Sequence, residues 1–180
     1  LDKNEEAIGV LRRISSTSAI EDFESLEELL ILLYNNKKYD EVITETKKIL
    51  QFPDADIKSI QNIIAKVYLT TGRYEESLEL LNKVLEQCPD NWYLKQALAQ
   101  ANMCLNNFEE AIIIYERLIE KEDVSKIQMF RNNLSTVYCN FGAYLYNQHR
   151  IADSFEKFKL ALTYDTKNPD VFYHLAICNL

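Results

Sequence analysis

The apolar residues of the chain recur at the spacing of one helix face, in stretches that come in pairs. The clearest pair lies in residues 58–91. Its first stretch has apolar residues three or four positions apart: Ile60, Ile63, Ile64, Val67 and Tyr68. Its second stretch repeats this spacing: Leu78, Leu81, Val84 and Leu85. Gly72 suits the left-handed backbone that ends a helix, and Pro89 cannot continue one. The pattern predicts a hairpin of two helices.

A short phrase marks the start of each second helix: an aromatic or apolar residue, two residues that are mostly acidic, and usually a small residue. It reads Tyr39-Asp40-Glu41-Val42, Tyr74-Glu75-Glu76-Ser77, Phe108-Glu109-Glu110-Ala111 and, more weakly, Ile151-Ala152-Asp153-Ser154. The fourth residues of successive copies are 35, 34 and 43 positions apart, and 43 is one 34-residue period plus 9. A period of about 34 residues built from two helices predicts a solenoid of stacked hairpins.

The repeats divide the whole chain and predict one all-α solenoid over residues 1–180. It consists of the second helix of a partial repeat with a loop, four repeats, and the first helix of another partial repeat: 1–22, 23–57, 58–91, 92–125, 126–168 and 169–180. Solenoid ends expose an apolar face unless something covers them. We therefore expect the chain to be a segment of a longer repeat protein, or its ends to be covered by a partner or another copy.

Composition supports helices and narrows the classes of partner. Only 3 Gly and 3 Pro occur in 180 residues, which favours helices with brief connections over sheets. The net charge of −8 disfavours nucleic acid and anionic membranes as partners, since both favour a basic face. No apolar run approaches the ~20 residues that span a bilayer, so we expect no membrane insertion. No signal sequence is visible, and a cytoplasmic, intracellular location is expected.

Candidate chemistry is sparse. The cysteines lie 16, 35 and 39 residues apart with no C-x-x-C pair, and they are Cys88, Cys104, Cys139 and Cys178. With only two histidines in the chain, a zinc site is not expected, and we expect buried, reduced thiols. There is no Gly-rich phosphate loop and no trustworthy Cys–His–acid set. The sequence predicts neither an enzyme nor a bound cofactor.

Several residues in each unit match one known family pattern. In the second full repeat the matching residues are Ile64, Ala65, Tyr68, Gly72, Tyr74, Ser77, Leu81 and Pro89. In the third they are Leu98, Ala99, Phe108, Ala111, Tyr115 and Leu118, and in the fourth they are Phe141, Gly142, Leu145, Ser154, Phe158 and Ala161. The chain thus resembles the tetratricopeptide repeat family over nearly its whole length. The resemblance implies a right-handed α-α superhelix whose inner wall is built from the first helices.

Matched by position, this inner wall is rich in amides and tyrosines and poor in charge. The predicted partner-binding residues are Asn62, Lys66, Tyr93, Gln96, Gln100, Met103, Cys139, Tyr146 and Tyr173. Amides bond a peptide backbone, while tyrosine and methionine supply apolar contact, so the wall suits an extended or helical peptide. The alternative is that these residues merely form a solvated helical face.

Some family members bind heat-shock chaperone tails through a two-carboxylate clamp, which needs Lys and Asn at set positions of three consecutive first helices. Those positions here hold Glu27 and Ile31, then Asn62 and Lys66, then Gln96 and Gln100. No three consecutive first helices supply the clamp, so we expect no binding of chaperone tails.

The interval between the third and fourth copies of the phrase is nine residues longer than one period, and the helical pattern continues through it. The apolar stripe continues through Ile127, Phe130, Leu134, Val137, Phe141 and Leu145. This predicts a first helix lengthened by about 13 Å. We expect its overhang to add partner contact through Met129 and Phe130. The alternative is a length irregularity packed on its neighbours.

Together these observations predict a protein–protein interaction scaffold within a multi-subunit assembly, which binds a partner's peptide or helix in its concave groove. Two alternatives remain open. One is a stand-alone peptide-binding adaptor or assembly chaperone. The other is a purely architectural solenoid that associates with itself through its uncapped ends.

Overall fold

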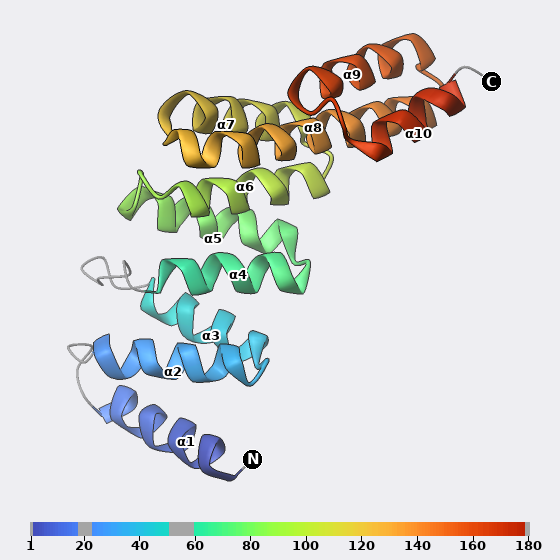
Figure 1. Ribbon diagram of the computed structural model, residues 1–180. Coiled ribbons are helices and arrows are strands. Elements are labelled where there is room, and N and C mark those ends of the chain that lie inside the picture. The colour runs from blue at the N-terminus through green and yellow to red at the C-terminus, as the bar shows by residue number, and fades with distance from the viewer. Residues whose placement is uncertain (1, 18–22, 51–59, 179–180) are drawn as a thin grey trace. The chain divides into compact units, whose positions relative to one another are not determined.

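The computed structural model describes residues 2–17, 23–50 and 60–178 (Figure 1). These residues form ten α-helices and no strand, which confirms the predicted all-α fold. The helices are α1 (Asp2–Thr17), α2 (Phe23–Asn35), α3 (Tyr39–Ile49), α4 (Gln61–Thr71), α5 (Tyr74–Gln87), α6 (Trp92–Cys104), α7 (Phe108–Lys121), α8 (Val124–Asn147), α9 (Ile151–Tyr164) and α10 (Pro169–Cys178). Two predicted repeat boundaries, after residues 22 and 57, lie outside the described residues.

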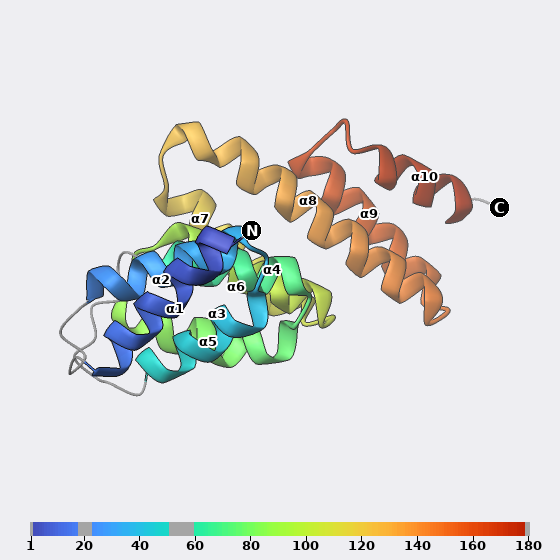
Figure 2. The same cartoon turned by 90° about the horizontal axis from the view of Figure 1, so that it is seen from below.

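The chain divides into two compact units, Leu1–Ala97 and Leu98–Leu180, which we call unit 1 and unit 2. The division falls within α6. In unit 1 the helices α1, α2, α3, α4 and α5 pack in chain order, and α2 also contacts α4 (Figure 1). In unit 2, α7, α8, α9 and α10 pack in the same order, and α8 also contacts α10 (Figure 2). Each unit is therefore a stack of helical hairpins in which first helices of neighbouring repeats touch.

The turns between paired helices share one backbone conformation. Each places one residue in the left-handed region: Lys37 (φ 59°), Gly72 (φ 67°), Asn106 (φ 62°) and His149 (φ 59°). These residues lie 35, 34 and 43 positions apart, the spacing of the sequence phrase. At three of the turns, the amide of the residue after the left-handed one donates back to a carbonyl of the helix, as in Arg150 N to Leu145 O at 2.9 Å. The structure thus repeats in phase with the sequence.

The small residues that match the family pattern in paired helices lie in the interior. They are all buried: Ala65, Ser77, Ala99, Ala111, Gly142 and Ser154. Helices α8 and α9 approach closely at Gly142, where an added Cβ would lie 2.6 Å from Cε1 of Phe158. In the first repeat the equivalent residues, Leu30 and Val42, are bulky yet also buried.

Helix α8 is one unbroken helix of 24 residues, about 36 Å long. It runs through the nine-residue excess without a turn. Its apolar stripe faces inward, since Phe130, Leu134 and Val137 are all fully buried. Side chains of α7 and α9 pack against it: the ring of Phe108 stacks on Phe141 (centroids 4.8 Å apart), and that of Tyr164 stacks on Tyr138 (5.6 Å).

Candidate partner-binding site

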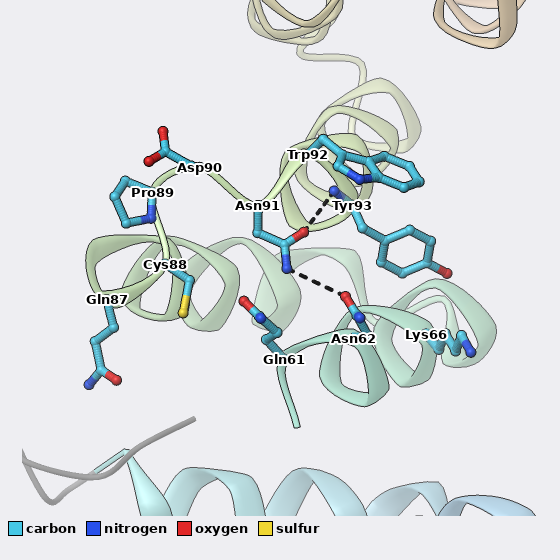
Figure 3. Close-up of a pocket in the computed structure, with 10 residues that line it drawn as sticks. All are labelled: Gln61, Asn62, Lys66, Gln87, Cys88, Pro89, Asp90, Asn91, Trp92 and Tyr93. Atoms are coloured by element: carbon cyan, nitrogen blue, oxygen red, sulfur yellow. Dashed lines mark hydrogen bonds between the residues drawn. The ribbon is translucent and has the colours of Figure 1, made fainter. Parts of the chain in front are cut away.

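Unit 1 contains a cavity of about 760 Å³ where the start of α4, the end of α5 and the start of α6 meet (Figure 3). We call it the α4–α6 cavity. Its lining residues are Gln61, Asn62, Lys66, Gln87, Cys88, Pro89, Asp90, Asn91, Trp92 and Tyr93. Three of them, Asn62, Lys66 and Tyr93, are among the partner-binding residues predicted from the sequence.

Asn91 organises the wall between two repeats. Its side-chain oxygen accepts hydrogen bonds from the backbone amides of Tyr93 (2.8 Å) and Leu94 (3.1 Å), which caps the start of α6. Its side-chain nitrogen donates to Oδ1 of Asn62 at 3.4 Å, across to α4 (Figure 3). Because one side chain holds both helices, the first turns of α4 and α6 keep a defined position at the cavity.

The aromatic side of the cavity comes from α6. The rings of Trp92 and Tyr93 meet edge to face, with centroids 5.5 Å apart. Burial raises the pKa of Tyr93 above its usual value, and the nearby Tyr34 of α2 raises it further. The Tyr93 ring is therefore only partly open to solvent. Lys66 is exposed on α4 and lies on the same side of the cavity as the Tyr93 ring.

The other predicted residues have mixed exposure. Gln96 is half-buried in unit 1, and its buried Oε1 has no hydrogen-bond partner among the described residues. In unit 2, Gln100, Met103 and Tyr146 are half-buried and Tyr173 is 65% exposed. Met103 Sδ accepts a hydrogen bond from the side chain of Asn140 at 3.3 Å.

Two predicted partner-binding residues are wrong. Cys139 is 3% exposed and Phe130 is 0% exposed, so neither side chain offers a surface to a partner. The face of α8 that carries them packs inward, and burial followed by the charge of Asp170 raises the pKa of the Cys139 thiol to about 11. Met129, beside Phe130, is 38% exposed. The expectation of buried thiols holds for Cys88 and is wrong for Cys104, which is exposed at the end of α6.

Several lining residues escaped the sequence prediction. Asn91 carried a readable signal, because an asparagine just before a helix is a typical N-cap. No sequence signal marks Gln87, Pro89 and Asp90 as lining residues. They lie beside α4 only because of how α4, α5 and α6 pack together. The α4–α6 cavity is thus lined by the connection between two repeats as well as by their first helices.

The chemistry of the α4–α6 cavity is that of amides and aromatic rings. Side-chain amides both donate and accept hydrogen bonds, as an extended peptide backbone requires. Within residues 2–17, 23–50 and 60–178, no three acidic, His or Cys side chains gather in a way that could hold a metal ion. Among the same residues, no helix is both long enough and apolar enough to cross a bilayer.

Known proteins share this fold. A family model described as tetratricopeptide repeat matches residues 68–134. The solved structure of MamA from Desulfovibrio magneticus RS-1 is similar, with 17% identity, 92% of this chain and 88% of that chain covered, and a TM-score of 0.61. The structure of MamA from AMB-1 has 18% sequence identity and a TM-score of 0.54, and the match covers 84% of this chain and 78% of that one. TTC0263, a thermophilic TPR protein in Thermus thermophilus, has 14% sequence identity and a TM-score of 0.51. The match covers 98% of this chain and 91% of that one. No curated protein sequence matches the chain.

Proposed function

Because residues 68–134 match the tetratricopeptide repeat and the chain has the fold of such repeat proteins, we propose that it is a protein-interaction scaffold whose unit 1 binds a peptide or helix of a partner protein. The binding surface is the inner wall formed by α4 and the first turns of α6, with the α4–α6 cavity at its centre. The partner belongs to a multi-subunit assembly that the scaffold holds together.

One observation supports this site above others. Repeat position alone predicts partner contacts at Asn62, Lys66 and Tyr93, and all three line the same cavity. The volume of about 760 Å³ lies within the range of about 300–1,000 Å³ that ligand pockets occupy. It has room for one or two side chains of a bound segment.

The side chains around the α4–α6 cavity offer a partner three kinds of contact: hydrogen bonds, apolar surface and a positive charge. Asn62 lies with exposed side-chain atoms on α4, where its amide can bond a partner backbone. Tyr93 and Trp92 give an apolar surface that loses little conformational entropy when a ligand covers it. Lys66 adds one positive charge at the rim, where it contributes to orientation more than to affinity.

Unit 2 carries partner contacts of its own, which we propose at exposed or half-buried residues of matching repeat positions. They are Gln100, Met103 and Tyr146, with Met129 on the lengthened helix. Since Phe130 is buried, the proposed overhang contact rests on Met129 alone.

The test is selection of peptides from a display library on the wild-type chain, followed by titration against variants. Tyr93→Glu places a charge on the aromatic wall and should weaken selected peptides at least about tenfold, which is about 1.4 kcal/mol. Lys83→Glu is the matched control, because Lys83 is exposed on α5 and does not line the cavity. Circular dichroism establishes that both variants remain folded. Peptides that bind Tyr93→Glu as tightly as the wild type would exclude the α4–α6 cavity.

A further inference from the structure

Helix α8 exposes no charged side chain. Lys126 and Arg131 are the charged residues among its 24, and both are half-buried. Lys126 pairs with Glu122 at 3.1 Å, and Arg131 donates to the backbone oxygen of Thr163 at 3.0 Å. On the adjacent helix α7, by contrast, most exposed residues are charged. Protein interfaces are depleted in charge at their centre, so the uncharged exposure of α8 is typical of a surface that a partner covers.

The exposed residues of α8 recur three or four positions apart, so they lie along one side of the helix. We call their central part the α8 face: Met129, Asn132, Thr136, Asn140 and Tyr144. Met129 is 38% exposed and Tyr144 is 40% exposed. The face therefore presents amide and hydroxyl groups between two larger, mostly apolar side chains.

The polar side chains of the α8 face keep hydrogen-bonding groups for a partner. Oδ1 of Asn132 accepts from Nε2 of Gln128 at 2.7 Å, which leaves the NH2 group of Asn132 as a donor. The Thr136 hydroxyl donates to the backbone carbonyl of Asn132 at 3.2 Å, and its oxygen remains an acceptor. The Asn140 amide donates to Met103 Sδ at 3.3 Å, and its Oδ1 remains an acceptor. Donors and acceptors are thus presented in a row along α8.

The spacing of these groups matches that of an extended polypeptide. Successive polar residues of the α8 face are four positions apart, which is a rise of about 6 Å in a helix. An extended chain presents backbone groups on the same edge every two residues, or about 6.6–6.8 Å. Over the two intervals from Asn132 to Asn140 the mismatch amounts to about 1–2 Å, which side-chain rotation absorbs.

The lengthening of α8 sets the length of such a segment. Met129 and Tyr144 are 15 positions apart, which is about 22 Å along the helix. An extended chain covers this distance in about six to seven residues. The other first helices α2, α4 and α6, with 13, 11 and 13 residues, are too short to hold such a pair.

An extended segment suits the α8 face better than a helix. In a helix the backbone N–H and C=O groups bond to each other, so a helical partner would offer this face only its side chains. Helices also dock by an apolar stripe, whereas the α8 face has apolar side chains only at its ends. An extended chain carries unpaired N–H and C=O groups along its edge, which the polar side chains can bond.

We propose that the α8 face binds an extended, uncharged segment of a partner protein, which runs along α8 with one backbone edge bonded to Asn132, Thr136 and Asn140. Apolar side chains of the segment, about six to seven residues apart, cover Met129 and Tyr144. A charge between them would lose its water without gaining a counter-charge. This inference deepens the proposed function and rests on it, because it specifies the segment that unit 2 binds. It is independent of the α4–α6 cavity.

The probe is a displayed library of random peptides of about 12 residues, long enough to span α8 when extended. Selection uses the full chain with Tyr93→Glu, so that peptides specific for the α4–α6 cavity are not recovered. We expect peptides that lack charge between two apolar residues about six to seven positions apart. They should bind the wild-type chain and Tyr93→Glu with the same affinity.

Two matched substitutions locate the bound peptide. Thr136 on α8 and Thr163 on α9 are both exposed threonines whose hydroxyls donate to a carbonyl of their own helix. Thr136→Lys should weaken the selected peptides at least about tenfold, because it removes an acceptor and places a charge on the α8 face. Thr163→Lys is the control and should leave their affinity unchanged. Circular dichroism establishes that both variants remain folded.

Methylation of the backbone nitrogens of a selected peptide, one at a time, tests the extended state without any change to the protein. One edge of an extended chain carries every second N–H, so methylation should weaken binding at least about fivefold at alternate positions and little at those between. A helical peptide shows no such alternation, because methylation interrupts its internal hydrogen bonds wherever it falls.

The outcomes separate this inference from the proposed function. Peptides that are weakened by Thr136→Lys but show no alternation overturn the extended segment and leave a partner site in unit 2. Peptides that bind Thr136→Lys as tightly as Thr163→Lys overturn the α8 face as the site. A selection that yields no binder overturns this inference together with the proposed contacts of unit 2, whereas peptides selected on the wild-type chain test the α4–α6 cavity separately.

Discussion

Gly142 and Phe158 touch where α8 and α9 cross: a Cβ added to the glycine would lie 2.6 Å from Cε1 of the ring. Phe158 is fully buried and also stacks on His174, so it has little room to move aside. We expect Gly142→Ala to lower the free energy of unfolding by about 1–3 kcal/mol, the usual cost of overpacking a core. Urea denaturation followed by circular dichroism measures it.

The chain offers its own control for this substitution. Gly9 also lies within a helix, and a Cβ there would meet nothing within 4 Å. Gly9→Ala should leave stability unchanged or raise it by up to about 1 kcal/mol, because alanine favours the helix. The double variant Gly142→Ala with Phe158→Leu should recover part of the loss. Equal effects of the two alanine substitutions would contradict the close crossing.

Substitutions at the left-handed turn residues should change the free energy of unfolding in opposite directions. Lys37 and His149 hold a conformation that is strained for residues with a Cβ, whereas Gly72 adopts it freely. His149→Gly should raise the free energy of unfolding by about 0.5–1 kcal/mol, and Gly72→Ala should lower it by about 1–2 kcal/mol. Asn106→Gly should change little, because asparagine tolerates this conformation. Thermal denaturation of the three variants tests the order, and a stabilised Gly72→Ala would refute it.

The cysteines should differ sharply in reactivity. Cys104 is exposed, whereas Cys139 is buried and its pKa is raised to about 11. Because an alkylating reagent can reach Cys104 in the folded protein, Cys104 should be alkylated quickly, whereas Cys139 should react only as the protein unfolds. Pulse labelling and peptide mass spectrometry measure both rates. Labelling of Cys139 at the rate of Cys104 in folded protein would contradict the burial of this face of α8.

Alkaline pH should destabilise the fold. Burial raises the pKa of Tyr138 to about 12 from an ordinary 10.0 and that of Cys139 to about 11 from 9.0, and it raises those of Tyr68 and Tyr115 as well. Between the ordinary and the raised values, the unfolded chain releases protons that the folded chain keeps. Stability is therefore fully present below pH 9 and falls as pH rises toward 12. In urea titrations across this range, Tyr138→Phe should show a shallower loss than the wild type.

The sequence predicts most of the fold because several independent features of the repeat recur at the same spacing. The phrase that begins each second helix, the left-handed turn residues and the buried small residues all recur in phase. Even where glycine is replaced by Lys37 or His149, the neighbouring phrase preserves the position of the turn. Leu30 and Val42, which are bulky where later repeats have small residues, are buried all the same.

The candidate site was predicted less completely, for two physical reasons. Repeat position identifies which face a residue occupies, so it found Asn62, Lys66 and Tyr93 in the α4–α6 cavity. It cannot report how tightly a particular helix packs, and the buried Cys139 and Phe130 were misjudged for that reason. Nor does it place a connection such as Cys88–Asn91 against α4, since that depends on how three helices meet.

The most direct test of the account is photo-crosslinking of a selected peptide to defined positions of unit 1. A photoreactive amino acid replaces Lys66 at the rim of the α4–α6 cavity or, in a separate variant, Lys83 on the exposed surface of α5. We expect efficient crosslinking from position 66 and none above background from position 83. Crosslinks from position 83 with none from position 66 would contradict the proposal that the inner wall of α4 and α6 receives the partner.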